Sequence, residues 1–539
     1  MAEAQQPPPI TAPSALPTAR LEDEHLPAVS SPLNPDAAAS RTRREKKATF
    51  KARGDDADSK GTTKKRKRST EPTHISPMRY KLPLPKAADY EPPKAPTFSP
   101  ILGREEWMES SEHVYNRKSF RYTKAISDPS FPALQYHRQT ETASGPSFEP
   151  EDTSPHVFFS SPDCTAVTTQ KGFRMARATT GAREGRYYWE AKILSGIRAD
   201  PMDGEPRGHV RIGFARREAQ LDGPVGFDAY SYGIRDASGQ KVHMSRPKDF
   251  ANVDFVEGDV IGLEICLPSL SLHRKVVEGT YNKAVDVSDD LDPVAAHEYL
   301  DIIRDRVPIR FKNTLYFEQY EYSYQKPLED LMNPAPTASV GAGTAATDPP
   351  NPNHPEHSLR TLPFSSIKVY KNGELLGTPY TDLLAFLPPS SKPPNQAGAR
   401  EGFDDGSLGY YPAISVFRGG AAEANFGPHF WFPLPDLAVD EDTEMADSTD
   451  IKVNPVTKKQ IVGQHSNLRP MSERFNEQIA EDIVYDLVDE VDFWSQCIGD
   501  TEADMNGFSD QGTTALMGPE ASDALGSGRE IKQLVQDEV

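Results

Sequence analysis

Cysteine is scarce in this chain of 539 residues, and long apolar runs are missing. The three cysteines, Cys164, Cys266 and Cys497, lie far apart, so the sequence offers neither a disulfide framework nor the paired spacing of a zinc site. The first residues, MAEAQQPPP, lack the apolar core of a signal peptide, and no stretch approaches the roughly 20 apolar residues that cross a bilayer. We therefore expect an intracellular protein without a metal site or a membrane contact.

The motifs of the common enzyme classes are also missing. The sequence shows no nucleophile with its base, no cluster of metal ligands and no phosphate-binding loop, and its 13 histidines are scattered. Gly341-Ala342-Gly343 does not follow a buried strand, which excludes a dinucleotide-binding motif. We expect a protein that is not an enzyme and needs no cofactor.

Proline is abundant and marks the beginning of the chain. Of the 49 prolines, 16 fall in the first 100 residues, where apolar periodicity is almost absent. Such a segment cannot bury enough surface to offset chain entropy, so we predict a disordered tail over 1–104. The net charge of −20 makes the whole chain soluble and a poor general binder of nucleic acid.

One part of this tail reverses the charge of the chain. Residues 41–68 hold 13 basic and 4 acidic residues, and they end in the run Lys64, Lys65, Arg66, Lys67 and Arg68. Three interpretations stay open: a nuclear import signal, a patch that contacts nucleic-acid phosphates, and a solvated charge run without a role.

Short aromatic and β-branched runs from residue 105 predict antiparallel strands. In 187–193, alternation predicts one buried and one solvent-facing side, and in 209–214 it directs Arg211 outward. The run 260–267 predicts a deeply buried strand, and Asn372-Gly373 predicts a hairpin turn. We expect a mainly β fold, an antiparallel β-sandwich over 105–436.

Two polar segments rich in Gly and Pro interrupt this pattern near 331–360 and 388–408, and we predict flexible insertions there. An acidic linker is expected over 437–470, a helix over 471–495 and a flexible tail over 496–539. The helix carries apolar residues at four-residue steps, broadened by Val484 and Val488: Phe475, Ile479, Ile483, Leu487 and Val491.

The opposite side of this predicted helix is strongly acidic. An isolated helix of about 20 residues is only marginally stable in water, so its apolar side needs a partner. It either packs back onto the sandwich or docks into a hydrophobic groove of another protein; the long polar linker favours the second interpretation.

Several segments resemble a SPRY domain in their residues and in their order, among them HVRIGFARREAQLDGPVGFDAYSYGIRD, EGDVIGLEICLP and YPAISVF. With the helix AEDIVYDLVDEVD, the chain more narrowly resembles the Ash-two/Bre-two subunit of COMPASS, the histone H3 lysine-four methyltransferase complex. No Cys-rich segment matches the zinc-containing N-terminal region of the animal members, so the resemblance is to the shorter fungal form.

The resemblance implies two binding sites. An acidic segment of the WD-repeat subunit would bind at Phe173, Arg211, Pro224 and Arg235, with Phe173 in place of the family's tyrosine. The terminal helix would dock on a Dumpy-thirty-type dimer through Ile479, Ile483, Val484, Leu487 and Val491. Reasoning from the residues alone leaves another possibility open, that Arg211 and Arg235 pair with nearby surface carboxylates.

The function that the resemblance implies is a non-catalytic scaffold and activator in the nucleus, while a SET-domain subunit carries the catalysis. Contact with nucleosomal DNA through the basic segment is a further expectation. The alternative function is a SPRY-type substrate receptor of a ubiquitin ligase.

Overall fold

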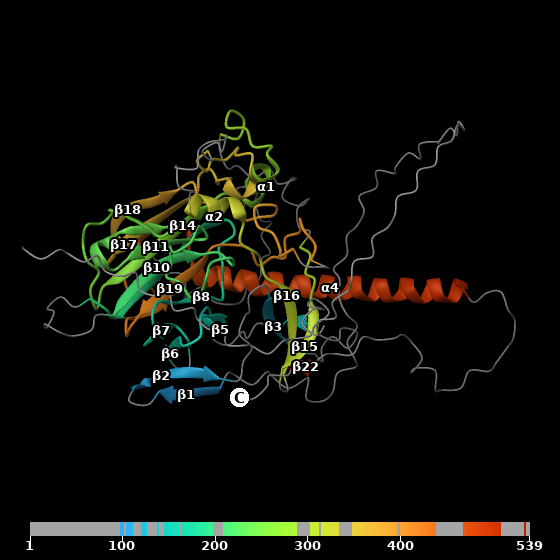
Figure 1. Ribbon diagram of the computed structural model, residues 1–539, viewed down its shortest axis with the longest axis horizontal. Helices are drawn as coiled ribbons and strands as arrows, with labels where there is room; N and C mark the ends of the chain where they lie inside the picture. The colour runs from blue at the N-terminus through green and yellow to red at the C-terminus, as the bar shows by residue number, and fades with distance from the viewer. Residues whose placement is uncertain are drawn as a thin grey trace, which may run out of the picture.

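The computed structural model places two large β-sheets face to face, with a third, smaller sheet beside them (Figure 1). It describes these residues: 97–101, 104–111, 120–126, 137–138, 145–160, 163–197, 208–287, 302–311, 314–333, 348–395, 399–437, 467–507 and 533–534.

The order of the strands in space differs from their order along the chain in all three sheets. The ten-stranded sheet consists, from one edge to the other, of β1 (Thr97–Ile101), β2 (Arg104–Ser111), β6 (Phe158–Ser160), β7 (Ala166–Thr168), β20 (Ala421–Asn425), β9 (Gly185–Ser195), β14 (Val260–Leu267), β17 (Ser366–Lys371) and β18 (Glu374–Thr381), with β21 (Leu468–Pro470) paired to β9. The seven-stranded sheet consists of β13 (Arg246–Lys248), β12 (Lys241–His243), β11 (Ser231–Arg235), β10 (His209–Ala215), β19 (Tyr411–Phe417), β8 (Arg174–Ala178) and β5 (Phe148–Thr153). The third sheet consists of β22 (Gln533–Leu534), β15 (Val307–Phe311), β16 (Thr314–Tyr320), β3 (Phe120–Ile126) and β4 (His137–Arg138).

The helices are few. Among the described residues they are α1 (Leu270–Glu278), α2 (Lys326–Met332), α4 (Met471–Gly507) and the short 3-10 turns η3 (Ala237–Gly239), η6 (His357–Leu359) and η7 (Pro435–Leu437). Strand pairs are antiparallel, except that β21 runs parallel to β9 and β22 runs parallel to β15. The predicted antiparallel β-sandwich is therefore confirmed.

The core between the two large sheets is aromatic. Trp189 on β9 and Phe214 on β10 are both fully buried, with ring centroids 6.2 Å apart, and Phe426 stacks on Trp189 at 6.0 Å. The predicted strand at 260–267 coincides with β14. The predicted hairpin turn is present because Asn372 and Gly373, with φ of 49° and 84°, adopt the left-handed conformations that a two-residue turn needs.

Strand β9 differs from the prediction on one side. Tyr188 and Glu190 were expected to face solvent, but both are fully buried. Leu434 and Leu468 cover this side. The carboxylate of Glu190 accepts hydrogen bonds from the backbone N–H groups of Trp431 (2.7 Å) and Phe432 (3.0 Å), and burial raises its pKa. The alternation correctly predicted that the two sides of the strand differ. It could not predict that a later segment of the chain covers the side with Tyr188 and Glu190.

The boundaries at both ends of the sandwich also shift. Strand β1 begins at Thr97, inside the predicted tail 1–104; its Pro100 is tolerated because β1 is the outermost strand of its sheet. Strand β21 occupies 468–470, at the end of the predicted acidic linker. The helix is longer than the predicted 471–495, since α4 extends to Gly507.

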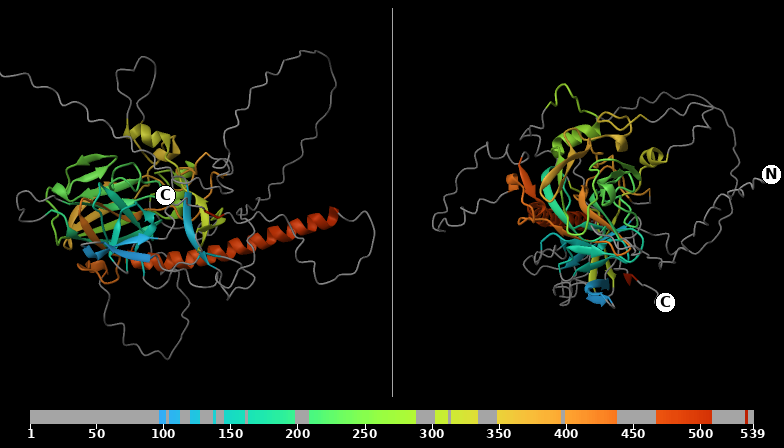
Figure 2. Two further views of the ribbon diagram at one scale, coloured as in Figure 1. Left: turned by 60° about the horizontal axis from the view of Figure 1, so that its bottom comes forward. Right: turned by 90° about the vertical axis from the view of Figure 1, so that its left-hand side faces the viewer.

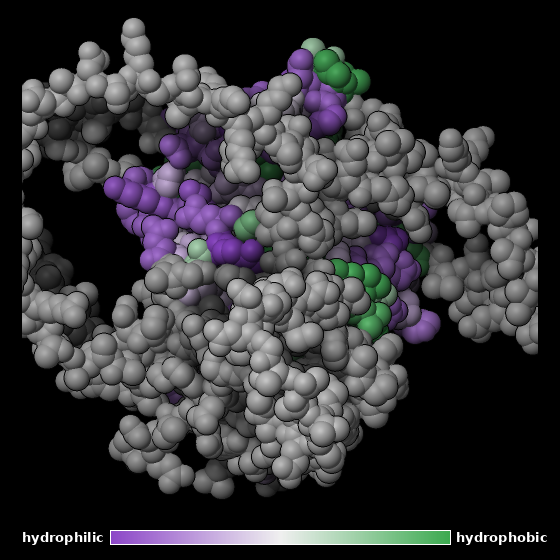
Figure 3. Space-filling view, turned by 90° about the vertical axis from the view of Figure 1, so that its right-hand side faces the viewer, coloured by the Kyte–Doolittle hydropathy of each residue, from purple (hydrophilic) through white to green (hydrophobic). Residues whose placement is uncertain are grey.

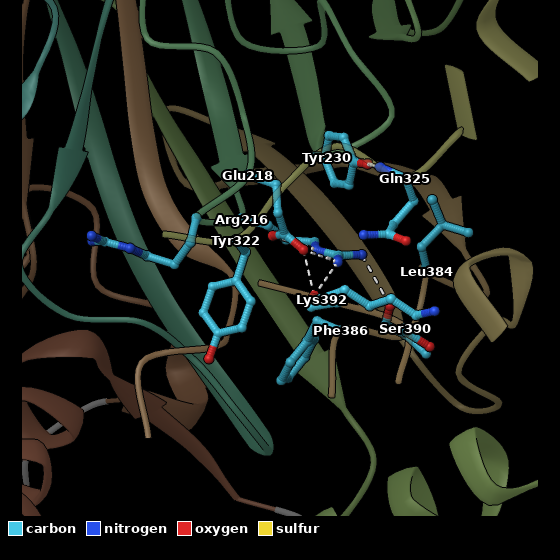
Figure 4. Close-up of polar contacts among 12 residues, drawn as sticks. Arg216, Glu218, Tyr230, Tyr322, Gln325, Leu384, Phe386, Ser390 and Lys392 are labelled. Atoms are coloured by element: carbon cyan, nitrogen blue, oxygen red, sulfur yellow. Dashed lines mark hydrogen bonds and ion pairs between the residues drawn. The ribbon is translucent and has the colours of Figure 1, made fainter. Parts of the chain in front are cut away.

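The segment 388–408, expected to be a flexible insertion, is held against the sandwich over its described residues. Ser390 and Ser391 are buried, and Ser391 bonds to both Arg216 and Glu218. Figure 4 shows Arg216 and Glu218 next to Ser390 and Lys392 of this segment. Arg216 is itself 1% exposed and binds Glu218 through two hydrogen bonds, of 3.2 and 2.5 Å. In the other expected insertion, 348–360 is likewise described and includes the buried Leu359; 334–347 lies outside the described residues.

We predict that Glu218→Ala destabilises the sandwich by about 3–5 kcal/mol, because it leaves the buried Arg216 guanidinium without its carboxylate. Denaturant unfolding of the variant measures the loss. Glu374→Ala removes an exposed carboxylate and is the matched control, for which we expect a change within about 0.5 kcal/mol. Equal stability of the two variants would contradict the prediction.

Candidate functional site

Arg211 lies on the outer side of the seven-stranded sheet. On β10, Val210, Ile212 and Phe214 enter the core, as the alternation predicted, so Arg211 faces the other way. The strand register places Arg235 of β11 on one side of Arg211 and Ser415 of β19 on the other. Two guanidinium groups therefore lie next to each other on this side of the sheet.

An aromatic pair lies beneath the first of these groups. The guanidinium carbon of Arg211 is 4.7 Å from the ring centroid of Phe173, which is a cation–π distance. The Phe173 ring in turn is 4.9 Å from that of Phe417, at the end of β19. Both rings are partly exposed, so they form a shelf on which a partner chain can lie.

Pro224 lies near Arg211 because the next residue, Val225, is bonded to the strand beside Arg211. The Val225 N–H donates to Ser415 Oγ at 2.9 Å, and Ser415 pairs with Arg211 in register. The structure thus brings together the four residues named from the sequence; we call Phe173, Arg211, Pro224 and Arg235 the arginine shelf. Sequence reasoning missed Ser415 and Phe417. Alternation in YPAISVF places Ser415 and Phe417 on the same side of their strand. Only the strand register shows that this side lies beside Arg211.

The charges of the arginine shelf are not neutralised by the described part of the chain. Among those residues, neither Arg211 nor Arg235 has a carboxylate within ion-pair distance; Arg235 donates instead to Gln240 Oε1 at 3.0 Å. Burial and the adjacent Arg235 lower the pKa of Arg211 to about 10, an effect that the charge of the nearby Asp236 only partly offsets, so Arg211 remains charged at neutral pH. Pairing with surface carboxylates was the alternative for these arginines, and the described residues do not provide it.

Helix α4 packs on its own chain at its beginning. Met471 and Phe475 are buried, and Gln478 donates from Nε2 to the carbonyl oxygen of Thr179 at 3.0 Å. Phe475, which the sequence placed in the partner-binding stripe, therefore belongs to the fold of this chain. The interpretation that the helix packs back is correct for this first part of α4.

The acidic side of α4 is held by two arginines near β15. Arg304 contacts Asp486 at 2.8 Å and Asp489 at 2.9 Å, and Arg306 contacts the same two carboxylates at 2.8 and 2.9 Å. All four residues are at most 4% exposed. We call these four residues the arginine–aspartate cluster. It shows that part of the acidic side faces protein and not solvent.

The apolar stripe lies on the opposite side of α4. With 3.6 residues per turn, Val484 and Val488 project away from Asp486, whereas Ile483, three residues before Asp486, faces sideways. Ile483, Val484 and Val488 are 47%, 54% and 49% exposed, whereas Ile479 and Leu487 are partly buried, and the side chain of Val491 lies outside the described residues. Figures 1 and 2 show α4 lying along the sandwich and extending past β15 and β16. Among the residues that are coloured in Figure 3, hydrophilic ones predominate and hydrophobic ones form small areas.

Three further sequence expectations concern the basic run, metal binding and membranes. The basic run at Lys64–Arg68 lies outside the described residues. Within the part of the chain that the structure describes, no group of three or more potential metal ligands is assembled. None of the described helices is both long and apolar enough to span a bilayer.

Comparison with known proteins decides the family. A curated protein of Colletotrichum higginsianum, COMPASS component cclA, is 50% identical over 98% of this chain and 97% of its own length. The chain belongs to this family of COMPASS components. The predicted resemblance is thereby confirmed.

Two more distant relatives are also named as components of such complexes. Set1 complex component ash2 of Schizosaccharomyces pombe is 38% identical over 77% of this chain and 52% of its own length. COMPASS component BRE2 of Saccharomyces cerevisiae is 23% identical over 72% and 89%. Among solved structures, a human SPRY domain is similar with 12% identity and a TM-score of 0.23, covering 50% of this chain and 95% of its own length. The scan against family models found no match.

We predict that replacing both Asp486 and Asp489 with Asn destabilises the described fold by about 3–5 kcal/mol, since the buried charges of Arg304 and Arg306 then lose the two carboxylates that lie within 3 Å of them. Chemical denaturation measures this, and protease cleavage within α4 should become faster. Asp348→Asn, at an exposed carboxylate, is the control. Unchanged stability in the double variant would show that the cluster does not hold the helix.

Proposed function

We propose that this chain is a non-catalytic scaffold and activator subunit of a histone H3 lysine-four methyltransferase complex of the COMPASS type. The observation that carries the proposal is the identity to COMPASS component cclA along nearly the whole chain. A role in histone modification places the protein in the nucleus, and the basic run 64–68 suits nuclear import or contact with nucleosomal DNA. The names of the relatives favour this function over a ubiquitin-ligase receptor.

The arginine shelf supports binding of an acidic segment of the WD-repeat subunit. Two neighbouring guanidinium groups offer charge-assisted, bidentate hydrogen bonds to carboxylates, and the Phe173 ring offers a stacking surface. Because neither arginine has an ion pair among the described residues, an acidic partner meets cations that need not first release a carboxylate.

The exposed stripe of α4 supports docking of a Dumpy-thirty-type helical dimer. Three large apolar side chains about half exposed to water would gain about 1 kcal/mol or more each on burial in a hydrophobic groove. The acidic side of the helix is already occupied by Arg304 and Arg306, so the stripe is the side left for a partner.

Activation then needs no catalytic group from this chain. By binding the WD-repeat subunit, the scaffold favours one orientation of the SET-domain subunit, which carries the catalysis and its cofactor chemistry. A partner can shift that equilibrium only by the difference in its affinity for the two arrangements. The activating effect should therefore depend on the contacts at the arginine shelf.

We predict that Arg211→Ala and Arg235→Ala each weaken binding to an acidic WD-repeat peptide by at least tenfold, because a charged hydrogen bond contributes about 1.5–3 kcal/mol. Calorimetric titration measures this. In a methylation assay of the SET and WD-repeat subunits, the wild-type chain should raise the rate on histone H3 and the double variant should not. Lys283→Ala, which removes an exposed cation outside the sheet, is the control. An unchanged rate at saturating wild-type chain would overturn the function.

We further predict that the double variant Val484→Asp and Val488→Asp abolishes docking of the helical dimer, since burying unpaired carboxylates costs several kcal/mol. Both side chains are about half exposed, so the melting temperature of the protein should hardly change. Asn476→Asp adds charge at an exposed polar position and is the control. Co-purification with the dimer reports docking; a fall in melting temperature by many degrees would mean that the stripe packs on its own chain.

A further inference from the structure

A second cationic site lies at the open edge of the sandwich, apart from the arginine shelf. It is a cavity of about 390 Å³ between β12 and β13, at the end of the seven-stranded sheet, and β18, at the end of the ten-stranded sheet. The strand register pairs Lys241 with Ile234, whose side chain enters the core, so Lys241 lies on the inner side of the sheet. Arg235, the next residue on β11, lies on the outer side with Arg211. The two cationic sites are therefore on opposite sides of one sheet.

The lining of the cavity carries a charge arrangement that is unfavourable by itself. Lys241 and Lys248 face each other directly across the β12–β13 pair, and His243 faces Arg246 in the same way. Like charges directly opposite each other destabilise a strand pair. Asp382 is the one carboxylate among the described lining residues, against the three cations Lys241, Arg246 and Lys248. Lys241 donates to the carbonyl oxygen of Pro379 at 2.6 Å, and Arg246 donates to those of Leu331 and Met332 at 3.1 Å. These acceptors are neutral, so the net positive charge remains, and an anion between the strands would reduce the repulsion.

His243 lies on the same side, and its pKa is lowered mainly by burial. Burial, and then the charges of Arg246 and Lys248, lower the pKa of His243 to about 4. Its Nδ1 lies 2.9 Å from the carbonyl oxygen of Ser231, and its ring stacks on Tyr232 at 4.2 Å. His243 is thus a neutral, rigid wall at pH 7, and the charge of the site comes from the lysines and the arginine.

A hydroxyl group in the lining has no partner in the described part of the chain. Thr361 is 4% exposed, and its Oγ1 makes no hydrogen bond there. Leaving a buried hydroxyl unpaired costs about 1–3 kcal/mol. Thr361 lines the cavity, so a ligand that reaches its side chain would give this hydroxyl the partner that the described fold does not supply.

We propose that this cavity binds an acidic side chain of a peptide segment from a partner protein, with the oxyanion between Lys241, Lys248 and the Thr361 hydroxyl. We call it the edge pocket. The proposal does not depend on the function of the arginine shelf.

A peptide fits better than DNA because the cations line a concave cavity, whereas a duplex presents its phosphates on a convex backbone. Strand β13 is also the last strand of its sheet in the described chain, so backbone groups at the mouth are available to an extended peptide. The ends of the 331–360 segment contribute Leu331 and Pro350 to the lining, but residues 334–347 between them contain no charged side chain.

The test is fluorescence anisotropy with labelled probes and the full chain carrying Arg211→Ala and Arg235→Ala, which removes binding at the arginine shelf. The probes are a hexaglutamate peptide, a glycine-rich peptide with one phosphoserine, and a 20-base-pair DNA duplex. Binding of either peptide supports the proposal, and the two peptides distinguish a carboxylate from a phosphate as the anionic group. Binding of none of the probes, or of DNA alone, overturns it.

The decisive variant is Thr361→Val, which keeps the shape of the side chain and removes only its hydroxyl. We expect peptide affinity to fall by about tenfold, at an unchanged or raised melting temperature, because the lost hydroxyl has no partner in the described fold. Thr180→Val is the matched control: Thr180 is also buried with an unpartnered Oγ1, but it does not line the edge pocket, so affinity should stay the same.

A second variant makes the result independent of the hydroxyl. Lys248 is exposed, so Lys248→Glu should leave the fold intact, weaken the peptide at least tenfold and reduce the salt dependence of binding. Parental affinity in both Thr361→Val and Lys248→Glu would overturn the proposal. So would tighter peptide binding after replacing the carboxylates of 440–450 by amides, because the site would then be filled by this chain itself.

Discussion

Burial of strand β9 on both sides is the constraint on which the rest of this structure depends. One side, with Trp189, closes the core between the sheets; the other, with Tyr188 and Glu190, is covered by the 430–437 segment and β21. Because β21 leads directly into α4, this second layer also fixes where the helix begins. The position of helix α4 thus follows from the packing of the central strand.

The arginine–aspartate cluster then fixes the rotation of that helix. A buried ion pair adds little net stability, because desolvation of both partners offsets their attraction, but removing one partner is costly. Its effect here is geometric: with Asp486 and Asp489 turned toward Arg304 and Arg306, Val484 and Val488 face away from these arginines and are about half exposed. A helix already ordered and oriented loses less conformational entropy when a partner binds.

The sequence predicted those features that depend on local patterns. Alternation placed Arg211 outside and its neighbours inside, and Asn372-Gly373 predicted the hairpin. It could not show that Glu190 is buried, because the covering segment lies more than 200 residues away, and a glutamate in an alternating strand is typical of a solvent-facing side. The partners of Asp486 are similarly distant, and an acidic helix side looks the same in sequence whether water or arginine faces it.

The seven-stranded sheet shows why register matters for function as much as alternation does. Alternation alone gives each arginine or lysine a side, but register decides which of them become neighbours. Pairing of Arg211 with Arg235 and of Lys241 with Lys248 sets like charges opposite each other on the two sides of one sheet. Such pairs weaken the strand pairing that holds them. The contacts of Arg211 with the Phe173 ring and of Lys241 with the Pro379 carbonyl oxygen offset part of this cost, and an anion between the paired cations would offset more. In a protein with a net charge of −20, these local concentrations of cations are the basis for the acidic partners proposed at both places.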